Sequence, residues 1–417
     1  MSIIAGAYSR KTGVPVPASV RESIKRLISR NAGDEVKVFG DSQAFFAKVD
    51  ICAFDESGEY VSPDKSVSLA AGEPLLVSAT STIASRQADI RRIHESFAVE
   101  NYSVLTEANS TYCAINYDAN KRRLSLITGK LGIRPLYYWL NDDLVIFASA
   151  LRVLEGIAEV PKRMNVRAVT EIAGLGYALA DRTPYADIFV LKAGEMLQVE
   201  GREVTRSIYW RWNEIGTATA SEDELLDELY RRFENAVSRR LRSDTSTIAY
   251  LSGGLDSRCV VASLCAKNAH VHTFNFARPD TQDQILGRLY AERANVIHTE
   301  TPKAAGDQRP DYSTLMTSAW ASSANHEKCP PERPHLAWSG EGGSVDLGHV
   351  HLSRKIVSLM RDGDISGAIQ EFIQTESIHV SPKLLNADAF KELESVIPLG
   401  IREELDDARS ADPARSF

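Results

Sequence analysis

The stretch Thr247-Ile-Ala-Tyr-Leu-Ser-Gly-Gly-Leu-Asp-Ser257 decides the fold of the second half of the chain. Its first five residues have the apolar pattern of a short buried strand, and a glycine turn follows them. The apolar segment Cys259–Cys265 then predicts a helix, and Val271–Phe276 alternates like a second strand. Strand, glycine loop, helix and strand make a parallel βαβ unit with a right-handed crossover. Ligands of such sheets bind beyond the carboxyl ends of the strands, where the glycine loop lies.

The glycine loop has the composition of an anion site. Gly253 and Gly254 let the backbone turn sharply and approach a ligand closely. The loop opens a helix, whose free N–H groups and dipole favour a phosphate, and Ser252 and Ser257 add hydroxyl donors. Asp256 would repel a phosphate directly, so we interpret it as a ligand for Mg²⁺, which prefers oxygen donors. The loop lacks the lysine of a P-loop NTPase, and the alternative is a tight turn with an aspartate cap.

A second small-residue loop follows later in the chain. Trp338-Ser-Gly-Glu-Gly-Gly-Ser344 carries one carboxylate, Glu341, among its glycines. An acid in this setting can act as a general base or orient an attacking amine. The alternative reading is a surface loop without a chemical role.

The first half of the chain reads as a sheet-dominated α+β domain. Strand patterns occur at 111–117, 124–128 and 144–148, and a helix is predicted near 83–98. The second half opens with a capping box at Ser221-Glu-Asp-Glu224 and a long amphipathic helix. We therefore predict three parts.
They are a domain at 1–205, a linker at 206–220 and a domain at 221–417 whose C-terminus looks truncated.

Composition excludes several classes of protein. The 417 residues are 43% apolar and 25% charged, with a net charge of −8, which argues against binding to nucleic acid or to an anionic membrane. No uncharged apolar run reaches the length that spans a bilayer, and the N-terminus lacks the pattern of a signal peptide. The five cysteines include no CxxC pair, which predicts reduced, buried thiols in a cytoplasmic protein.

These motifs together resemble the asparagine synthetase family, whose relatives include β-lactam synthetases and lasso-peptide cyclases. Leu251–Ser257 resembles the family's pyrophosphate loop, and Ser339–Gly342 resembles its second ATP motif. Gly132–Tyr138, followed by Phe147-Ala-Ser, looks like the end of its glutaminase-like domain, and Tyr209-Trp210 fits its interdomain joint. The resemblance implies an α+β Ntn-hydrolase-like sandwich followed by an α/β parallel-sheet ATP-pyrophosphatase (PP-loop) domain.

The resemblance also implies a reaction. ATP with Mg²⁺ would activate a small-molecule or peptide carboxylate as an acyl-adenylate, releasing pyrophosphate, and an amine would then displace AMP. By this resemblance Glu341 lies near the acyl-adenylate and deprotonates or orients the amine. The remaining residues implied for the ATP site are Leu251, Ser252, Gly253, Gly254, Asp256, Ser257, Phe276, Ser339 and Gly340. The oligomeric state stays open, a homodimer being one alternative.

The chain departs from the family pattern at several positions. Ser2 stands where family glutaminases carry cysteine, and a hydroxyl ionises far less readily than a thiol. No Asn-Gly-Glu-Ile-Tyr-Asn segment is present, and Thr128-Gly129 replaces the usual Arg-Asp pair. We therefore expect Ser2 to be a vestigial nucleophile position and the glutaminase domain to be inactive. Gly343-Ser344 replaces Ala-Asp of the second motif, and Asp346 is the candidate to take over its metal contact.

Three functions remain open at this point. The first is a ligase that adenylates a carboxylate, such as that of aspartate, for attack by ammonia or an amine. The second is an intramolecular cyclase of the lasso-peptide or β-lactam type, which needs no glutaminase. The third is a nucleotide-binding regulatory paralogue without turnover, which the short C-terminus favours.

Overall fold

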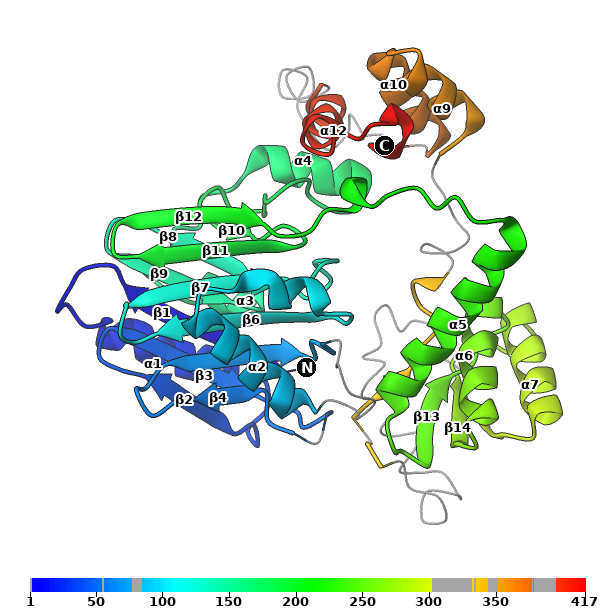
Figure 1. Cartoon of the computed structure of the whole chain (residues 1–417), viewed down its shortest axis with the longest axis horizontal. Helices are drawn as coiled ribbons and strands as arrows, with labels where there is room; N and C mark the ends of the chain where they lie inside the picture. The colour runs from blue at the N-terminus through cyan, green and yellow to red at the C-terminus, as the bar shows by residue number, and fades with distance from the viewer. Residues whose placement is uncertain are drawn as a thin grey trace. The chain divides into compact units, whose positions relative to one another are not determined.

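The computed structural model describes residues 2–54, 56–76, 85–301, 332–333, 335–343, 352–376, 378 and 395–417. The chain forms two compact units, whose elements are labelled in Figure 1. The first unit consists of residues 1–51, 56–216 and 351–417, and the second consists of residues 52–55 and 217–350.

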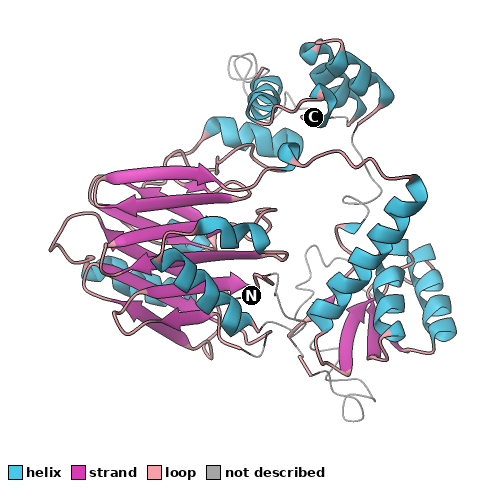
Figure 2. Cartoon of the chain, viewed as in Figure 1, coloured by secondary structure: helices cyan, strands magenta, loops and turns pink. Residues whose placement is uncertain are grey.

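The first unit contains two six-stranded antiparallel sheets, drawn in magenta in Figure 2. In spatial order, one sheet contains β10 (Phe189–Val190), β8 (Tyr137–Leu140), β9 (Leu144–Ala148), β1 (Ile3–Ser9), β3 (Ala44–Val49) and β2 (Val36–Gly40). The other contains β12 (Glu203–Ile208), β11 (Glu195–Glu200), β7 (Arg123–Thr128), β6 (Tyr112–Asp118), β5 (Val67–Gly72) and β4 (Glu59–Val61).

The two sheets pack face to face and helices cover both outer faces. One apolar cluster joins Ile4 and Phe46 of the first sheet to Leu69 and Ile115 of the second. A second cluster packs α1 (Ala18–Ile28) and α3 (Leu151–Glu155) on the first sheet. A third packs α2 (Arg86–Ala98) and the 3-10 helix η1 (Tyr102–Glu107) on the second sheet. The result is a four-layer αββα sandwich, which confirms the predicted Ntn-hydrolase-like fold.

Strand β1 shows why this arrangement fits the sequence. All seven of its residues are buried, because one face meets the other sheet and the opposite face meets α1. At Gly6 a methyl group would lie 2.6 Å from the rings of Phe147 and Phe46 on the two neighbouring strands of the same sheet, so glycine leaves room for both rings to pack against β1. Ser2 immediately precedes β1, at the end of a strand in the middle of its sheet.

Residues 352–417 belong to the first unit, although the sequence analysis placed them in the ATP-binding domain. They form α9 (Arg354–Arg361), α10 (Ile365–Thr375), α12 (Val396–Asp407) and the 3-10 helix η4 (Pro413–Arg415). Their apolar cluster includes Leu175 of α4 (Val166–Leu175) and Leu179. Glu403 also pairs with Arg167 at 2.6 Å. Sequence order could not reveal this packing, because the apolar partners lie more than 170 residues apart.

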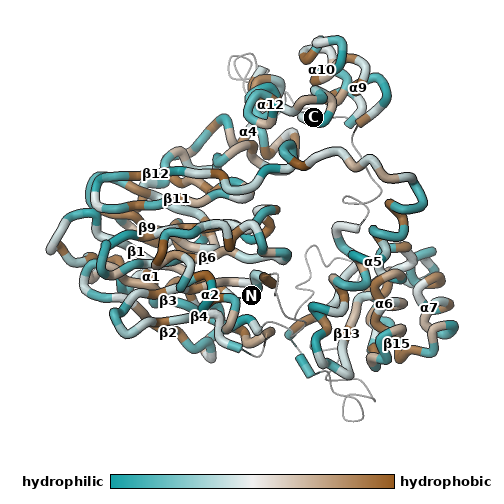
Figure 3. Tube along the Cα trace, viewed as in Figure 1, coloured by the Kyte–Doolittle hydropathy of each residue, from teal (hydrophilic) through white to brown (hydrophobic). Residues whose placement is uncertain are grey.

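The second unit contains a four-stranded parallel sheet in the order β15 (Ile297–Glu300), β14 (His270–Asn275), β13 (Ser246–Tyr250) and β16 (Ala337–Trp338). Its helices are α5 (Glu222–Leu241), α6 (Leu255–Ala266) and α7 (Gln282–Ala294). Residues of all three helices share one apolar cluster with β13 and β14. Figure 3 shows hydrophobic and hydrophilic residues alternating along these helices, as expected for helices that pack one face on a sheet. The predicted parallel βαβ unit is confirmed.

Local predictions agree with the structure in most places. The capping box is present, with Ser221 and Glu224 each bonding the other's backbone N–H. Two of the cysteines differ from expectation, because Cys52 and Cys259 are exposed rather than buried. The remaining short element is the 3-10 helix η2 (Trp212–Glu214), where a linker was predicted. None of the helices in the described ranges is long and apolar enough to cross a membrane.

Candidate active site

The two glycine loops leave neighbouring strands at the same edge of the parallel sheet. Strand β13 pairs with β16, with Ala249 opposite Trp338, and with β14 on its other side. The first loop follows β13 and the second follows β16. The chain order therefore reverses at β13, and ligands of open parallel sheets bind at such reversals.

The loops touch each other, and glycines permit the contact. A methyl group on Gly340 would lie 2.3 Å from the backbone nitrogen of Ser257. A methyl group on Gly343 would lie 2.8 Å from Cγ of Asp256. The second loop therefore packs on the first turn of α6, and the half-buried Asp256 carboxylate lies between the two loops.

Hydrogen bonds inside the first loop fix its shape. The N–H of Ser252 donates to Oγ of Ser257 at 3.1 Å, and the two serine hydroxyls lie 3.0 Å apart. The N–H of Gly254 donates to Oγ of Ser252 at 3.2 Å. Both hydroxyls therefore brace the loop, and their role as donors to a phosphate stays a prediction. Gly254 is the N-cap of α6 and supplies no side-chain cap, so the helix N-terminus retains its attraction for an anion.

Three further predicted residues also follow the strands of this sheet. Leu251 is buried; its N–H donates to the carbonyl of Phe274 at 2.9 Å. Phe276 is half-buried and its ring centroid lies 5.9 Å from that of Tyr250. Ser339 is exposed after β16. The topology thus brings the two glycine loops and the segment after β14 to one edge of the sheet. The roles of these residues in ATP binding stay predictions.

Of the two acids predicted in and just after the second loop, the structure describes only Glu341. Glu341 is exposed, and its N–H donates to Oγ of Ser339 at 2.9 Å, which holds the turn. Its carboxylate stands on the loop that packs beside Asp256. Asp346 lies outside the described residues, so its predicted metal contact stays a prediction.

Sequence reasoning missed two residues that support the first loop. Oδ1 of Asp283, in the first turn of α7, accepts from the N–H of Gly253 at 3.1 Å. The Asn275 side chain donates to the carbonyls of Leu251 at 2.9 Å and Asp283 at 3.2 Å. The Thr281 cap with an acid in the following turn marked this helix start, but its contact with the loop needs the tertiary structure.

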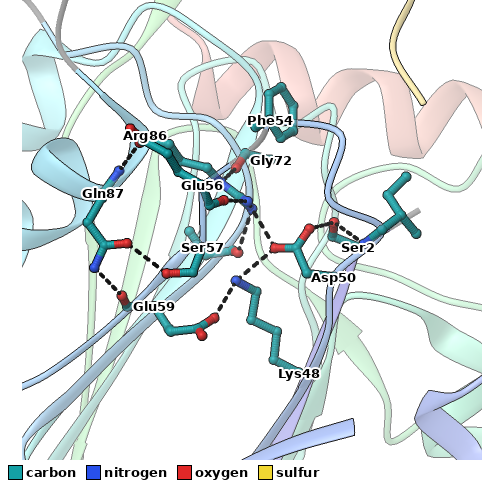
Figure 4. A network of polar contacts seen from close by, with 12 residues as sticks. Ser2, Lys48, Asp50, Phe54, Glu56, Ser57, Glu59, Gly72, Arg86 and Gln87 are labelled. Atoms are coloured by element: carbon teal, nitrogen blue, oxygen red, sulfur yellow. Dashed lines mark hydrogen bonds and ion pairs between the residues drawn. The ribbon is translucent and has the colours of Figure 1, made fainter. Parts of the chain in front are cut away.

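In the first unit, Ser2 joins a buried network of charged side chains (Figure 4). Its Oγ donates to Oδ1 of Asp50 at 2.8 Å. The other oxygen, Oδ2, lies 2.9 Å from both Nζ of Lys48 and Nη1 of Arg86. Burial alone would raise the pKa of the Asp50 carboxyl, but the two cations and the Ser2 hydroxyl lower that pKa to about 2.

The two cations of this network are fully buried and engaged. Lys48 also pairs with Glu59 at 2.9 Å, and both cationic side chains are 0% exposed. The guanidinium of Arg86 donates to the carbonyls of Gly72 and Glu56 at 2.9 Å each. The signal for this network in the sequence was a lysine and an aspartate in the otherwise apolar run Ala44–Asp50.

Asp50 does not activate Ser2 as a general base. A carboxylate whose pKa is about 2 is too weak a base to take a hydroxyl proton near neutral pH. Asp50 therefore orients the Ser2 hydroxyl as a hydrogen-bond donor.

In comparisons with known proteins, each half of the chain matches a family model. The family model of a glutamine amidotransferase domain matches residues 80–210, and that of asparagine synthase matches residues 228–316. The chain is 28% identical over 177 residues to Asparagine synthetase (glutamine-hydrolyzing) 2 of Bacillus subtilis, covering 40% of this chain and 24% of that protein. It is 28% identical over 241 residues to Asparagine synthetase (glutamine-hydrolyzing) 1 of the same organism, covering 55% and 38%.

The chain thus spans well under half the length of these curated relatives. Among solved structures, the allosteric regulatory enzyme of purine biosynthesis matches with a TM-score of 0.33 and 12% identity, covering 65% of this chain and 64% of that one.

Proposed function

Because the chain belongs to the asparagine synthetase family, we propose that it is an ATP-dependent, AMP-forming ligase that joins a carboxylate to ammonia or an amine. One observation carries the proposal. The glycine loops after β13 and β16 pack against each other, with the Asp256 carboxylate between them at the reversal point of the sheet. The substrate is a small-molecule or peptide carboxylate.

The first loop and α6 bind the phosphates of ATP in this proposal. Backbone N–H groups at the start of a helix hold phosphate oxygens, and glycines let a ligand approach the backbone. Asp256 supplies carboxylate oxygens beside that position, which fits the oxygen ligands that Mg²⁺ prefers. When bound, Mg²⁺ offsets the negative charge that accumulates on the departing pyrophosphate.

The reaction has two half-reactions. An oxygen of the substrate carboxylate attacks the α-phosphorus of ATP, the bond to pyrophosphate breaks, and an acyl-adenylate forms. The amine nitrogen then attacks the acyl carbon, the C–O bond to AMP breaks, and the amine loses a proton. We assign that proton to the Glu341 carboxylate, since it is exposed on the loop beside Asp256.

A second candidate concerns the source of the amine. Ser2 offers a hydroxyl where family glutaminases carry a far more readily ionised thiol, and that hydroxyl donates to the Asp50 carboxylate, which favours a domain that does not hydrolyse glutamine. A ligase of this kind takes free ammonia or an amine of the substrate itself. Intramolecular closure of a peptide or a β-lactam ring is therefore the alternative that this observation favours.

Two measurements test the proposal. Calorimetry should detect Mg·ATP binding to the native chain, and Asp256→Ala should weaken it while Asp227→Ala, which removes an exposed acid on α5, should leave it unchanged. Exchange of labelled pyrophosphate into ATP should then depend on the carboxylate supplied.
ATP binding without exchange for every carboxylate tried would favour the regulatory alternative. Absence of binding would reject the nucleotide site.

A further inference from the structure

Asp283 places a negative charge directly on the glycine loop. Its Oδ1 accepts the N–H of Gly253 at 3.1 Å, and a methyl group on Gly253 would lie 3.0 Å from Cα of Asp283. Both residues are accessible to solvent: Gly253 is half-buried and Asp283 is exposed. Within the described residues no cation pairs with the Asp283 carboxylate.

Two neighbouring contacts fix the backbone position of Asp283. Its carbonyl accepts from the Asn275 side chain at 3.2 Å, and the same amide donates to the carbonyl of Leu251. The next residue, Gln284, is buried and donates to Glu300 at 2.7 Å. The packing of α7 therefore holds the backbone of Asp283 beside the loop, which keeps its exposed carboxylate within reach of the Gly253 N–H.

A carboxylate and a phosphate compete for the same donor. The backbone N–H groups of a glycine loop are the groups that hold phosphate oxygens. Here the N–H of Gly253 already donates to an anion, whose charge would also repel an arriving phosphate.

We propose that Asp283 is a positioning residue whose carboxylate competes with phosphate for the N–H of Gly253 and so weakens phosphate binding to the loop. Its carboxylate holds the loop by accepting the Gly253 N–H, and an anion that binds to this N–H must displace it. A bound divalent cation screens the repulsion, so Asp283 makes phosphate binding depend more steeply on Mg²⁺. This inference rests on the proposed ATP site and adds a residue that controls access to it.

The test uses inorganic pyrophosphate as the probe, titrated into the full chain by calorimetry with excess Mg²⁺ and, separately, with EDTA. Asp283→Asn keeps the shape and an oxygen that can accept the Gly253 N–H, but it removes the charge. Without Mg²⁺, we expect pyrophosphate to bind this variant about five- to tenfold more tightly than the native chain, as removal of one unit charge a few ångströms away implies. With saturating Mg²⁺ the two should differ less than about twofold.

Two controls isolate the charge at this position. Glu292→Gln removes an exposed acid nine residues further along α7, about 13 Å along the helix axis, and should bind like the native chain in both conditions. Asp283→Glu keeps the charge and should gain no affinity in EDTA.

The outcomes separate the inference from the proposed function. If Asp283→Asn matches the native chain in both conditions, the competing role of Asp283 is refuted while pyrophosphate binding by the native chain upholds the site. If the variant loses affinity only with Mg²⁺, Asp283 is a metal ligand and the competing role is refuted. If the native chain binds pyrophosphate in neither condition, the proposed ATP site fails and the inference falls with it.

Discussion

Replacing Asp50 tests whether its carboxylate stabilises the first unit by compensating two buried cations. Asp50→Asn removes the negative charge that lies 2.9 Å from both Lys48 and Arg86, while keeping the size of the side chain. Lys48 retains Glu59, and Arg86 retains its carbonyl acceptors, so the network is weakened rather than erased.

The expected loss follows from the pKa of Asp50. A fall from 3.8 to about 2 on folding corresponds to about 2 kcal/mol of stability near neutral pH. Removing one partner of a buried ion pair costs about 3–5 kcal/mol. We therefore expect the free energy of unfolding of the first unit to fall by about 2–4 kcal/mol.

The sign of the pH dependence is also fixed. The pKa of Asp50 is lower in the native state than in the unfolded state. Its contribution to the free energy of unfolding is therefore complete above about pH 5 and is lost as pH falls towards 2. Near pH 3 about half of it should be gone. The gap between native and Asp50→Asn should therefore narrow on acidification.

Differential scanning calorimetry of the full chain at several pH values measures this gap. Asp143→Asn is the matched control, because Asp143 pairs with Lys11 at 2.6 Å while both side chains are about half exposed. Such a surface pair contributes about 0–1 kcal/mol. If Asp50→Asn costs no more than Asp143→Asn, or if its cost does not shrink towards pH 3, the role assigned to Asp50 is refuted.

Three further predictions follow from the site and from the docked C-terminal helices. Glu341→Gln should preserve pyrophosphate exchange but lower amide formation by about 10²–10⁴, as expected for loss of a general base; a parallel fall of both would assign Glu341 to ATP or metal binding instead. The intact chain should release little glutamate from glutamine, because the Ser2 hydroxyl ionises far less readily than the thiol that family glutaminases carry, and robust release that Ser2→Ala abolishes would contradict this. Ile397→Ala, in the buried core around α12, should destabilise the first unit by about 2–4 kcal/mol, whereas Leu399→Ala on the same helix should change little because Leu399 is 51% exposed; equal melting temperatures for the two variants would argue against docking of α12.

The sequence by itself predicted the parts of this protein whose signals are local. The capping box at Ser221, the strand before Leu251 and the glycine turn after it depend on neighbouring residues, so their structures could be inferred from spacing and residue type. The parallel βαβ unit followed from the order of these elements. The family resemblance supplied the sandwich of the first half and the expectation of a second ATP loop.

Only the tertiary structure decided which distant residues meet. Strand order places the loop of Gly340 against Ser257, and α7 places Asp283 on Gly253, because hydrogen bonding between strands is set by global topology and not by sequence distance. The same holds for Ser2, whose partner Asp50 directly follows the neighbouring strand β3 and pairs with Lys48 of that strand and with Arg86 from a helix. The return of α12 to α4 depends on apolar surface that either helix could have buried elsewhere, and only the packed structure shows the choice.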